Sequence, residues 1–106
     1  MKKIASIVFS TLLLSNTVSA SVDGATRLQE KAARVIAQEL EMTRDQINEL
    51  NEIFSENAPI GDLDKCTAYG YLRSQQMAEK MPSMSDKLTD AMQKFVTWGC
   101  VVKNGG

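Results

Sequence analysis

The sequence contains no histidine, only two cysteines, and no long apolar run beyond its N-terminal segment. Histidine is the commonest general base near neutral pH and the commonest metal ligand. Its absence excludes a Ser-His-Asp triad and argues against a zinc site. Ser-Lys and carboxylate pairs are still able to catalyse, but a charged helical surface supplies such pairs by chance. We therefore predict a protein that is not an enzyme, with no catalytic residues, no metal and no cofactor.

Residues 1–20 have the pattern of a signal peptide. Two lysines precede an apolar run over residues 4–14, and small residues follow at positions 18–20. This run is well short of the ~20 residues that a helix needs to cross a bilayer. We expect a cleaved segment rather than membrane insertion, with a mature chain that starts at Ser21 in the periplasm.

Cleavage after residue 20 removes two lysines and no acids, so the net charge changes from −1 to −3. This acidic balance argues against a nucleic-acid partner. The remaining residues, 21–106, make a single domain. A domain of this size has a marginal hydrophobic core, which a disulfide helps to stabilise.

The two cysteines are spaced for a structural disulfide. Cys66 and Cys100 lie almost equidistant from Pro82, one before it and the other after it. An even pair of cysteines in an exported chain is normally oxidised, whereas a redox pair normally has a C-x-x-C spacing. If two antiparallel helices meet at Pro82, the start of one lies beside the end of the other. The prediction is a disulfide between Cys66 and Cys100.

Apolar periodicity predicts four helices and no strand. The first spans residues 25–40. The second begins at Thr43, which has the T-x-x-Q pattern of a capping box, and ends at the breaker run 57–61. The third begins near Asp62 and ends at Pro82. The apolar stripe of the second helix consists of Ile47, Leu50, Ile53 and Phe54, and the stripe of the third consists of Leu63, Cys66, Gly70, Tyr71, Ser74, Met77, Ala78 and Met81.

The fourth helix is expected to begin after a cap at Ser83 or Ser85 and to end at Gly99. Residues 101–106 then form a loose tail. The predicted fold is a small all-α four-helix bundle, in which the disulfide closes an antiparallel C-terminal hairpin.

Negative charge is concentrated around the second helix. Between Glu39 and Asp64 the chain has eight acids and a single base, Arg44. A field of one sign steers a basic partner and raises the encounter rate more than the final affinity. The alternative is that these acids form an ordinary solvated face. The candidate partner-binding acids are Asp45, Glu49, Glu52 and Glu56.

Three apolar side chains are further candidates for partner binding. Tyr69 and Leu72 fall on the side of the third helix opposite Cys66, and Trp98 falls at the edge of the fourth. Aromatic anchors are enriched at binding hot spots. The alternative, which we favour for Tyr69 and Leu72, is packing under the first or second helix.

Three methionines, Met77, Met81 and Met84, are spaced to meet at the tip of the hairpin. Thioethers are soft ligands that suit Cu(I). Methionine also fills irregular gaps in helical cores, and we favour this interpretation.

One resemblance concerns the C-terminal half. The run Cys66-Thr67-Ala68-Tyr69-Gly70-Tyr71-Leu72, followed by a last helix ending in Trp98-Gly99-Cys100, resembles the cysteine-paired helical immunity proteins that protect the periplasm from peptidoglycan amidases of the type VI secretion system. The similarity covers only the segment from Cys66 to Cys100 and carries over only the cysteine pair. It implies an α-helical protein that binds and blocks a cell-wall hydrolase, in many cases as a homodimer.

A second resemblance concerns Met42-Thr43-Arg44-Asp45-Gln46, which is similar to the L-T-x-x-Q signature of periplasmic stress chaperones of the Spy and CpxP type. That family normally has a longer chain and a second copy of the signature, and the segment 88–93 misses the spacing by one residue. We therefore favour an exported inhibitor or immunity protein that blocks a toxic enzyme. A stress chaperone and a phage-type exclusion factor are the alternatives.

Overall fold

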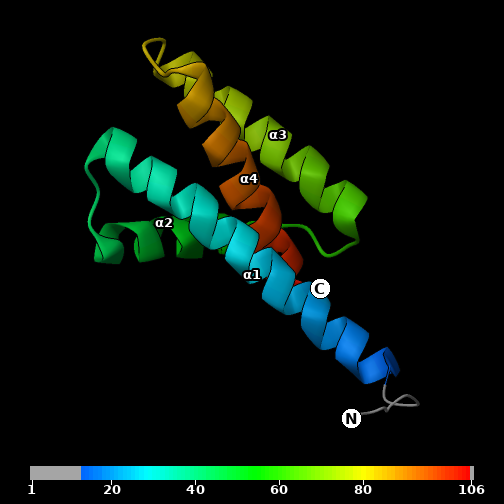
Figure 1. Ribbon diagram of the computed structural model, residues 1–106. Helices are drawn as coiled ribbons and strands as arrows, with labels where there is room; N and C mark the ends of the chain where they lie inside the picture. The colour runs from blue at the N-terminus through cyan, green and yellow to red at the C-terminus, as the bar shows by residue number, and fades with distance from the viewer. Residues whose placement is uncertain (1–12, 106) are drawn as a thin grey trace.

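The computed structural model describes the backbone of residues 13–105 and the side chains of residues 22–105, and this part of the chain contains no strand. It forms four helices, α1 (Leu13–Leu40), α2 (Arg44–Glu56), α3 (Leu63–Lys80) and α4 (Asp86–Lys103) (Figure 1). The predicted all-α bundle with an antiparallel, disulfide-closed C-terminal hairpin is confirmed. The predicted signal peptide, residues 1–20, lies outside the residues whose side chains are described.

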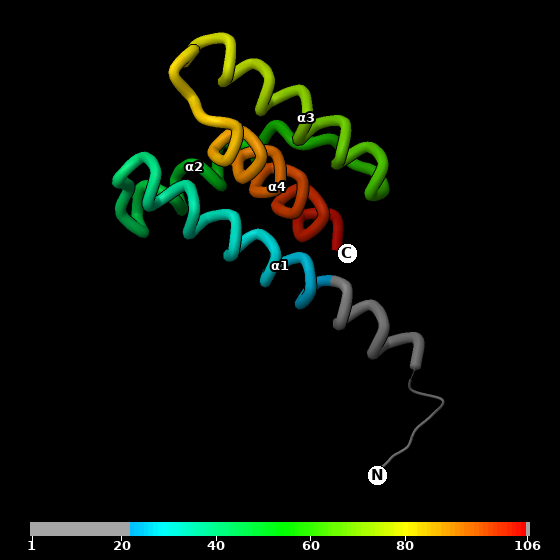
Figure 2. The backbone as a smooth tube through the Cα atoms, turned by 45° about the horizontal axis from the view of Figure 1, so that its top comes forward, coloured from blue at the N-terminus to red at the C-terminus, as the bar shows by residue number. Residues whose placement is uncertain are grey.

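Helix α4 is the centre of the bundle. It packs against α1, α2 and α3, whereas α1 and α3 do not approach each other closely (Figure 2). Because three helices surround α4, most of its length is buried. Its buried residues are Leu88, Ala91, Met92, Phe95, Val96, Thr97, Gly99, Cys100 and Val101. None of the four helices, as far as the structure describes them, combines the length and apolar character required to span a membrane.

Side-chain caps fix the first residues of three helices. The predicted capping box is present: Thr43 Oγ1 accepts from Gln46 N at 3.2 Å, and Thr43 N donates to Gln46 Oε1 at 2.8 Å. Asp62 and Ser85 each accept from the backbone N–H three residues later, at 3.2 and 3.1 Å. Each cap satisfies a donor that has no partner inside the helix and contributes about 1 kcal/mol.

Glycine allows α4 to approach its neighbours closely. A Cβ on Gly70 would lie 2.8 Å from Gln93 O, so α3 packs closely on α4 at this glycine. A Cβ on Gly99 would lie 2.7 Å from Gln29 Nε2 of α1. The prediction that Gly99 ends the last helix is wrong, because α4 continues to Lys103. Packing against α1, rather than a left-handed turn, explains this glycine.

Two clusters of buried apolar side chains form the core. The larger one joins α1, α2 and α4 around Ile36, Ile47 and Phe95. Met77 and Met84 pack against it, as expected for gap-filling side chains. The smaller cluster surrounds the disulfide and contains Ala25, Cys66, Cys100 and Val101.

The interpretation of residues 101–106 as a loose tail requires correction. Val101 is buried in the disulfide cluster, and α4 includes residues up to Lys103. The apolar pair at 101 and 102 completes the packing around Cys100, which extends the helix by one turn beyond Gly99.

Candidate functional site

Four carboxylates form one row along the outward face of α2. They are separated by four, three and four residues, the spacing at which side chains lie above one another on a helix. All four are exposed, whereas Ile47 on the opposite face is buried in the core. We call them the acidic row: Asp45, Glu49, Glu52 and Glu56.

The acidic row has no counter-ion within residues 22–105, where no member lies within 4.0 Å of a basic nitrogen. Arg44, at the start of α2, pairs instead with Glu30 of α1, and its two terminal nitrogens donate to both carboxylate oxygens. This hydrogen bond lowers the pKa of Glu30 below its ordinary value and raises the pKa of Arg44. The pair is neutral as a unit, so Arg44 does not offset the charge of the row.

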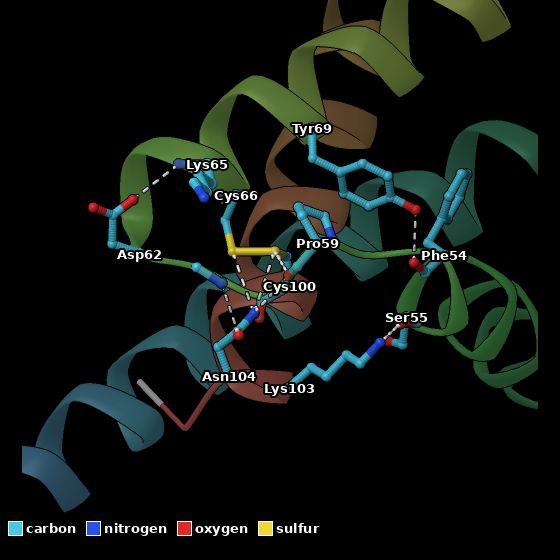
Figure 3. The surroundings of a disulfide bond; sticks show 11 residues. Phe54, Ser55, Pro59, Asp62, Lys65, Cys66, Tyr69, Cys100, Lys103 and Asn104 are labelled. Carbon is cyan, nitrogen blue, oxygen red and sulfur yellow. Dashed lines mark hydrogen bonds between the residues drawn. A yellow bond between two sulfur atoms is a disulfide. The ribbon is translucent and has the colours of Figure 1, made fainter.

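One base of α4 reaches the edge of the acidic row. Lys103 Nζ donates to the backbone oxygen of Ser55 (Figure 3). Both residues line a shallow hollow together with Glu52 and Glu56. Its ammonium group satisfies a carbonyl of the last turn of α2, where cations suit the helix dipole. The C-terminal end of α2 is therefore attached to α4.

An exposed apolar residue lies beside the acidic row. Ile53 is 56% exposed and shares a helix face with Glu49 and Glu56, which lie four residues before and three residues after it. The prediction that Ile53 belongs to the buried stripe is wrong. The core contacts the face that carries Ile47, Leu50 and Phe54. An apolar centre with a charged rim is typical of protein interfaces.

The disulfide joins the start of α3 to the last turns of α4, as predicted. The Sγ atoms of Cys66 and Cys100 are 2.08 Å apart and the Cα atoms 5.4 Å apart. Both residues are fully buried. Within the described part of the chain, no group of three or more Cys, Asp or Glu residues is placed to hold a metal ion.

Asn104 connects the disulfide to the loop between α2 and α3. Its Nδ2 donates to Pro59 O at 3.0 Å and to Cys100 O at 2.9 Å, and its Oδ1 accepts from Gly61 N at 3.1 Å (Figure 3). Asn104 is not among the residues that the sequence pattern predicts to be important. The signal that could have identified it is the pair Asn104-Gly105 after the last apolar residues, because such a pair commonly ends a helix.

Tyr69 lies between α3 and α2 and packs against both core clusters. Its Oη donates to Phe54 O at 2.7 Å, and the guanidinium carbon of Arg73 lies 5.3 Å from its ring centroid. Packing is therefore the correct interpretation for Tyr69. It does not hold for Leu72, which is 52% exposed.

The buried face of α3 differs from the predicted stripe at two positions. Leu63 and Tyr71 were expected to face the core, and both are exposed. Tyr69 takes the place of Tyr71, because α2 lies on the Tyr69 side of α3 and α1 does not reach the other side.

Trp98 is half-buried and contacts the disulfide cluster. It also lines a groove between α1 and α4, so it does not share a surface with the acidic row. The structure thus places the seven predicted partner-binding residues in different environments. The acidic row is on α2, Tyr69 packs inside, Leu72 is on the outside of α3, and Trp98 is in the groove.

Comparison of the chain with protein-family models, with curated proteins and with solved structures gives no match.

Proposed function

We propose that this chain is an exported periplasmic binding protein, an inhibitor or immunity protein that blocks a cell-wall-degrading or other toxic enzyme. The observation that supports this proposal is the acidic row, four exposed carboxylates without a counter-ion among the described residues, beside the exposed Ile53. A surface with this charge favours a partner with a basic surface.

The acidic row is held in position before any partner arrives. Its helix starts at a complete capping box and is attached near its end by Lys103 and by the Tyr69 hydroxyl. A preformed face loses little backbone entropy on binding, so more of the contact energy appears as affinity.

Inhibition then follows because α2 occupies the substrate cleft of the enzyme. A helix with its side chains is about 10 Å wide, which suits insertion into an elongated substrate cleft. Carboxylates of the acidic row would pair with basic groups at the cleft, while Ile53 fills an apolar position between them. Substrate is excluded for as long as the complex lasts.

The test is charge reversal with a matched control. The chain and its variant Glu49→Lys/Glu56→Lys are used as bait in periplasmic extract, and the captured enzyme is then assayed with and without each protein. The control Asp23→Lys/Glu79→Lys changes the net charge equally at exposed positions on α1 and α3.

We expect the chain and the control variant to bind and inhibit the same enzyme, and the α2 variant to bind at least about tenfold more weakly. The association rate of the unchanged protein should also fall with added salt, and that of the α2 variant should not. Equal affinity and equal salt dependence for both variants would exclude the acidic row as the contact surface.

A stress chaperone is the second candidate, and it is favoured by the number of large apolar side chains at the surface. The exposed ones are Leu28, Leu40, Ile53, Ile60, Leu63, Tyr71 and Leu72. A chaperone would suppress the aggregation of unrelated unfolded proteins at near-stoichiometric ratios, whereas an inhibitor would not. A phage-type exclusion factor would use the same contacts as an inhibitor, and the origin of the captured enzyme distinguishes these two roles.

A further inference from the structure

A second surface lies between α1 and α4, where a groove of about 360 Å³ is open to solvent. Its floor is apolar and includes Leu28 and Val35 from α1 and Trp98 from α4. Leu28 is 43% exposed, and Val35 and Trp98 are half-buried. Such a floor offers apolar contact area that no other helix covers in the part of the chain that the structure describes.

Basic side chains border this groove on both sides. Lys31 lies on α1, and Lys87 and Lys94 lie on α4. One acid, Asp90, accompanies them and pairs with Lys94 at 3.0 Å. The rim therefore has a net positive charge, opposite in sign to the acidic row.

The spacing of the rim indicates the shape of the ligand. Lys87 and Lys94 are seven residues apart, so they lie on one side of α4 and about 10 Å apart along its axis. A ligand that carries two anionic groups at a similar distance would pair with both lysines at once. Two acids seven residues apart on another helix have the same separation, and the apolar residues between them would meet Trp98 and Leu28.

We propose that this groove binds an amphipathic helix of another protein, in which acidic residues flank an apolar stripe. This is the helix-in-groove mode of recognition, in which apolar anchors enter a groove and charged residues set the register. The charge of the rim supplies the preference for acids, and the floor supplies the apolar contact area.

A second copy of this chain is the less suitable occupant. Its α2 also carries acids seven residues apart, Glu49 and Glu56, with Ile53 between them. However, α2 approaches α4 near Gly99, and Lys94 lies about 140° away around the helix. Copies joined through these two different surfaces would contact head to tail, and such contacts form a ring only if the rotation between copies closes, and an open chain otherwise.

This inference does not depend on the proposed role of α2, because the groove and the acidic row share no residue. If it is correct, the chain has two contact surfaces of opposite charge, one on each side of α4. A basic partner and an acidic helix could then bind at the same time.

The single tryptophan makes the groove directly observable. Trp98 is the only tryptophan of the chain, so its fluorescence reports on the groove. The probe is a designed helical peptide of about 20 residues with leucines along one face and glutamates seven residues apart on its flanks. We expect saturable, one-to-one binding with a blue shift of Trp98 emission, and no binding of a peptide whose glutamates are replaced by lysines.

Charge reversal at the rim is the second arm of the test. The variant Lys87→Glu/Lys94→Glu should bind the glutamate peptide at least about tenfold more weakly. The control Lys65→Glu/Lys80→Glu changes the net charge equally at exposed positions on α3 and should stay within about twofold. All four lysines are exposed, and circular dichroism of each variant confirms that it is folded.

Three results would overturn the proposal. If the rim variant and the control variant bind the glutamate peptide equally weakly, the peptide is attracted by overall charge alone. Equal binding of the lysine peptide would show an unselective apolar patch. The third result is self-association of the protein that increases with its concentration in sedimentation experiments. If the variant Lys87→Glu/Lys94→Glu abolishes this self-association, the groove binds a second copy. The variant Glu49→Lys/Glu56→Lys should bind the peptide normally even if it loses the basic partner.

Discussion

Tyr69 Oη donates a hydrogen bond to the backbone oxygen of Phe54 at 2.7 Å and so joins α3 to the last turn of α2 (Figure 3). Tyr71, two residues further along the same helix, is 57% exposed and makes no side-chain hydrogen bond within the described residues. The two tyrosines of this chain therefore differ in burial and in hydrogen bonding, which makes each a control for the other.

Removal of the Tyr69 hydroxyl should destabilise the fold. The change Tyr69→Phe leaves the ring in place but leaves the Phe54 carbonyl without this donor, which costs about 1 kcal/mol. The same change at Tyr71 should alter the free energy of unfolding by less than about 0.5 kcal/mol. Urea denaturation measures both, and equal losses would contradict the proposed role of the Tyr69 hydrogen bond.

The helices and their first residues could be predicted because the signals are local. The caps at Thr43, Asp62 and Ser85 act within three residues of themselves. The disulfide could be predicted because the break at Pro82 sets two helices side by side. Which face of a helix is buried depends instead on where the other helices lie. For this reason the sequence did not distinguish Tyr69 from Tyr71.

The candidate site shows the same division between local and distant signals. The exposure of Glu49 follows from its polarity and its spacing on α2. The pairing of Arg44 with Glu30, 14 residues earlier, depends on how α1 packs against α2. The exposure of Ile53 has the same origin, because an isoleucine beside an apolar stripe is buried only if the neighbouring helix extends far enough to cover it.

Asn104 should contribute more to the free energy of unfolding than a residue of a loose tail would. Its side chain bonds the loop at Pro59 and Gly61, so Asn104→Ala leaves partly buried backbone groups unpaired. We expect a loss of about 1–3 kcal/mol in the free energy of unfolding. Asn48, exposed on α2, serves as the control, and Asn48→Ala should change stability by less than about 0.5 kcal/mol. Wild-type stability of Asn104→Ala would show that the Asn104 hydrogen bonds do not stabilise the contact between the end of α4 and this loop.

Two helical glycines should respond to alanine with opposite signs. At Gly70 an added Cβ would lie 2.8 Å from Gln93 O, so α3 and α4 must separate, with an expected cost of about 1–3 kcal/mol. At Gly24 nothing lies within 4 Å of the added Cβ. There alanine should stabilise the helix by roughly 0.5–1 kcal/mol, because it lowers the entropy of the unfolded chain. Thermal denaturation of both variants shows whether the signs differ.

Reduction of the disulfide should destabilise the bundle without removing its helices. Cys66 and Cys100 are 34 residues apart, and opening a loop of this size releases chain entropy worth roughly 3–4 kcal/mol in the unfolded state. The free energy of unfolding is measured with and without dithiothreitol. The variant Cys66→Ser/Cys100→Ser should resemble the reduced protein and should not respond to the reductant. An equal response of both proteins would show that the reductant acts elsewhere.

The ion pair of Glu30 and Arg44 should stabilise the protein at neutral pH and not in acid. The hydrogen bond from Arg44 lowers the pKa of Glu30 below its ordinary value of 4.5 in the folded state. A group with a lowered pKa contributes stability above its unfolded pKa, and this contribution is lost as the pH falls through the folded value.

A double-mutant cycle isolates this contribution from the rest of the titration. The cycle uses Glu30→Gln, Arg44→Gln and the double variant, with urea denaturation at pH values on both sides of the Glu30 transition. We expect a small favourable coupling energy at neutral pH, because both side chains are substantially exposed. The coupling should vanish once Glu30 is protonated. A coupling that stays constant as the pH falls would show that the two side chains interact through packing rather than charge.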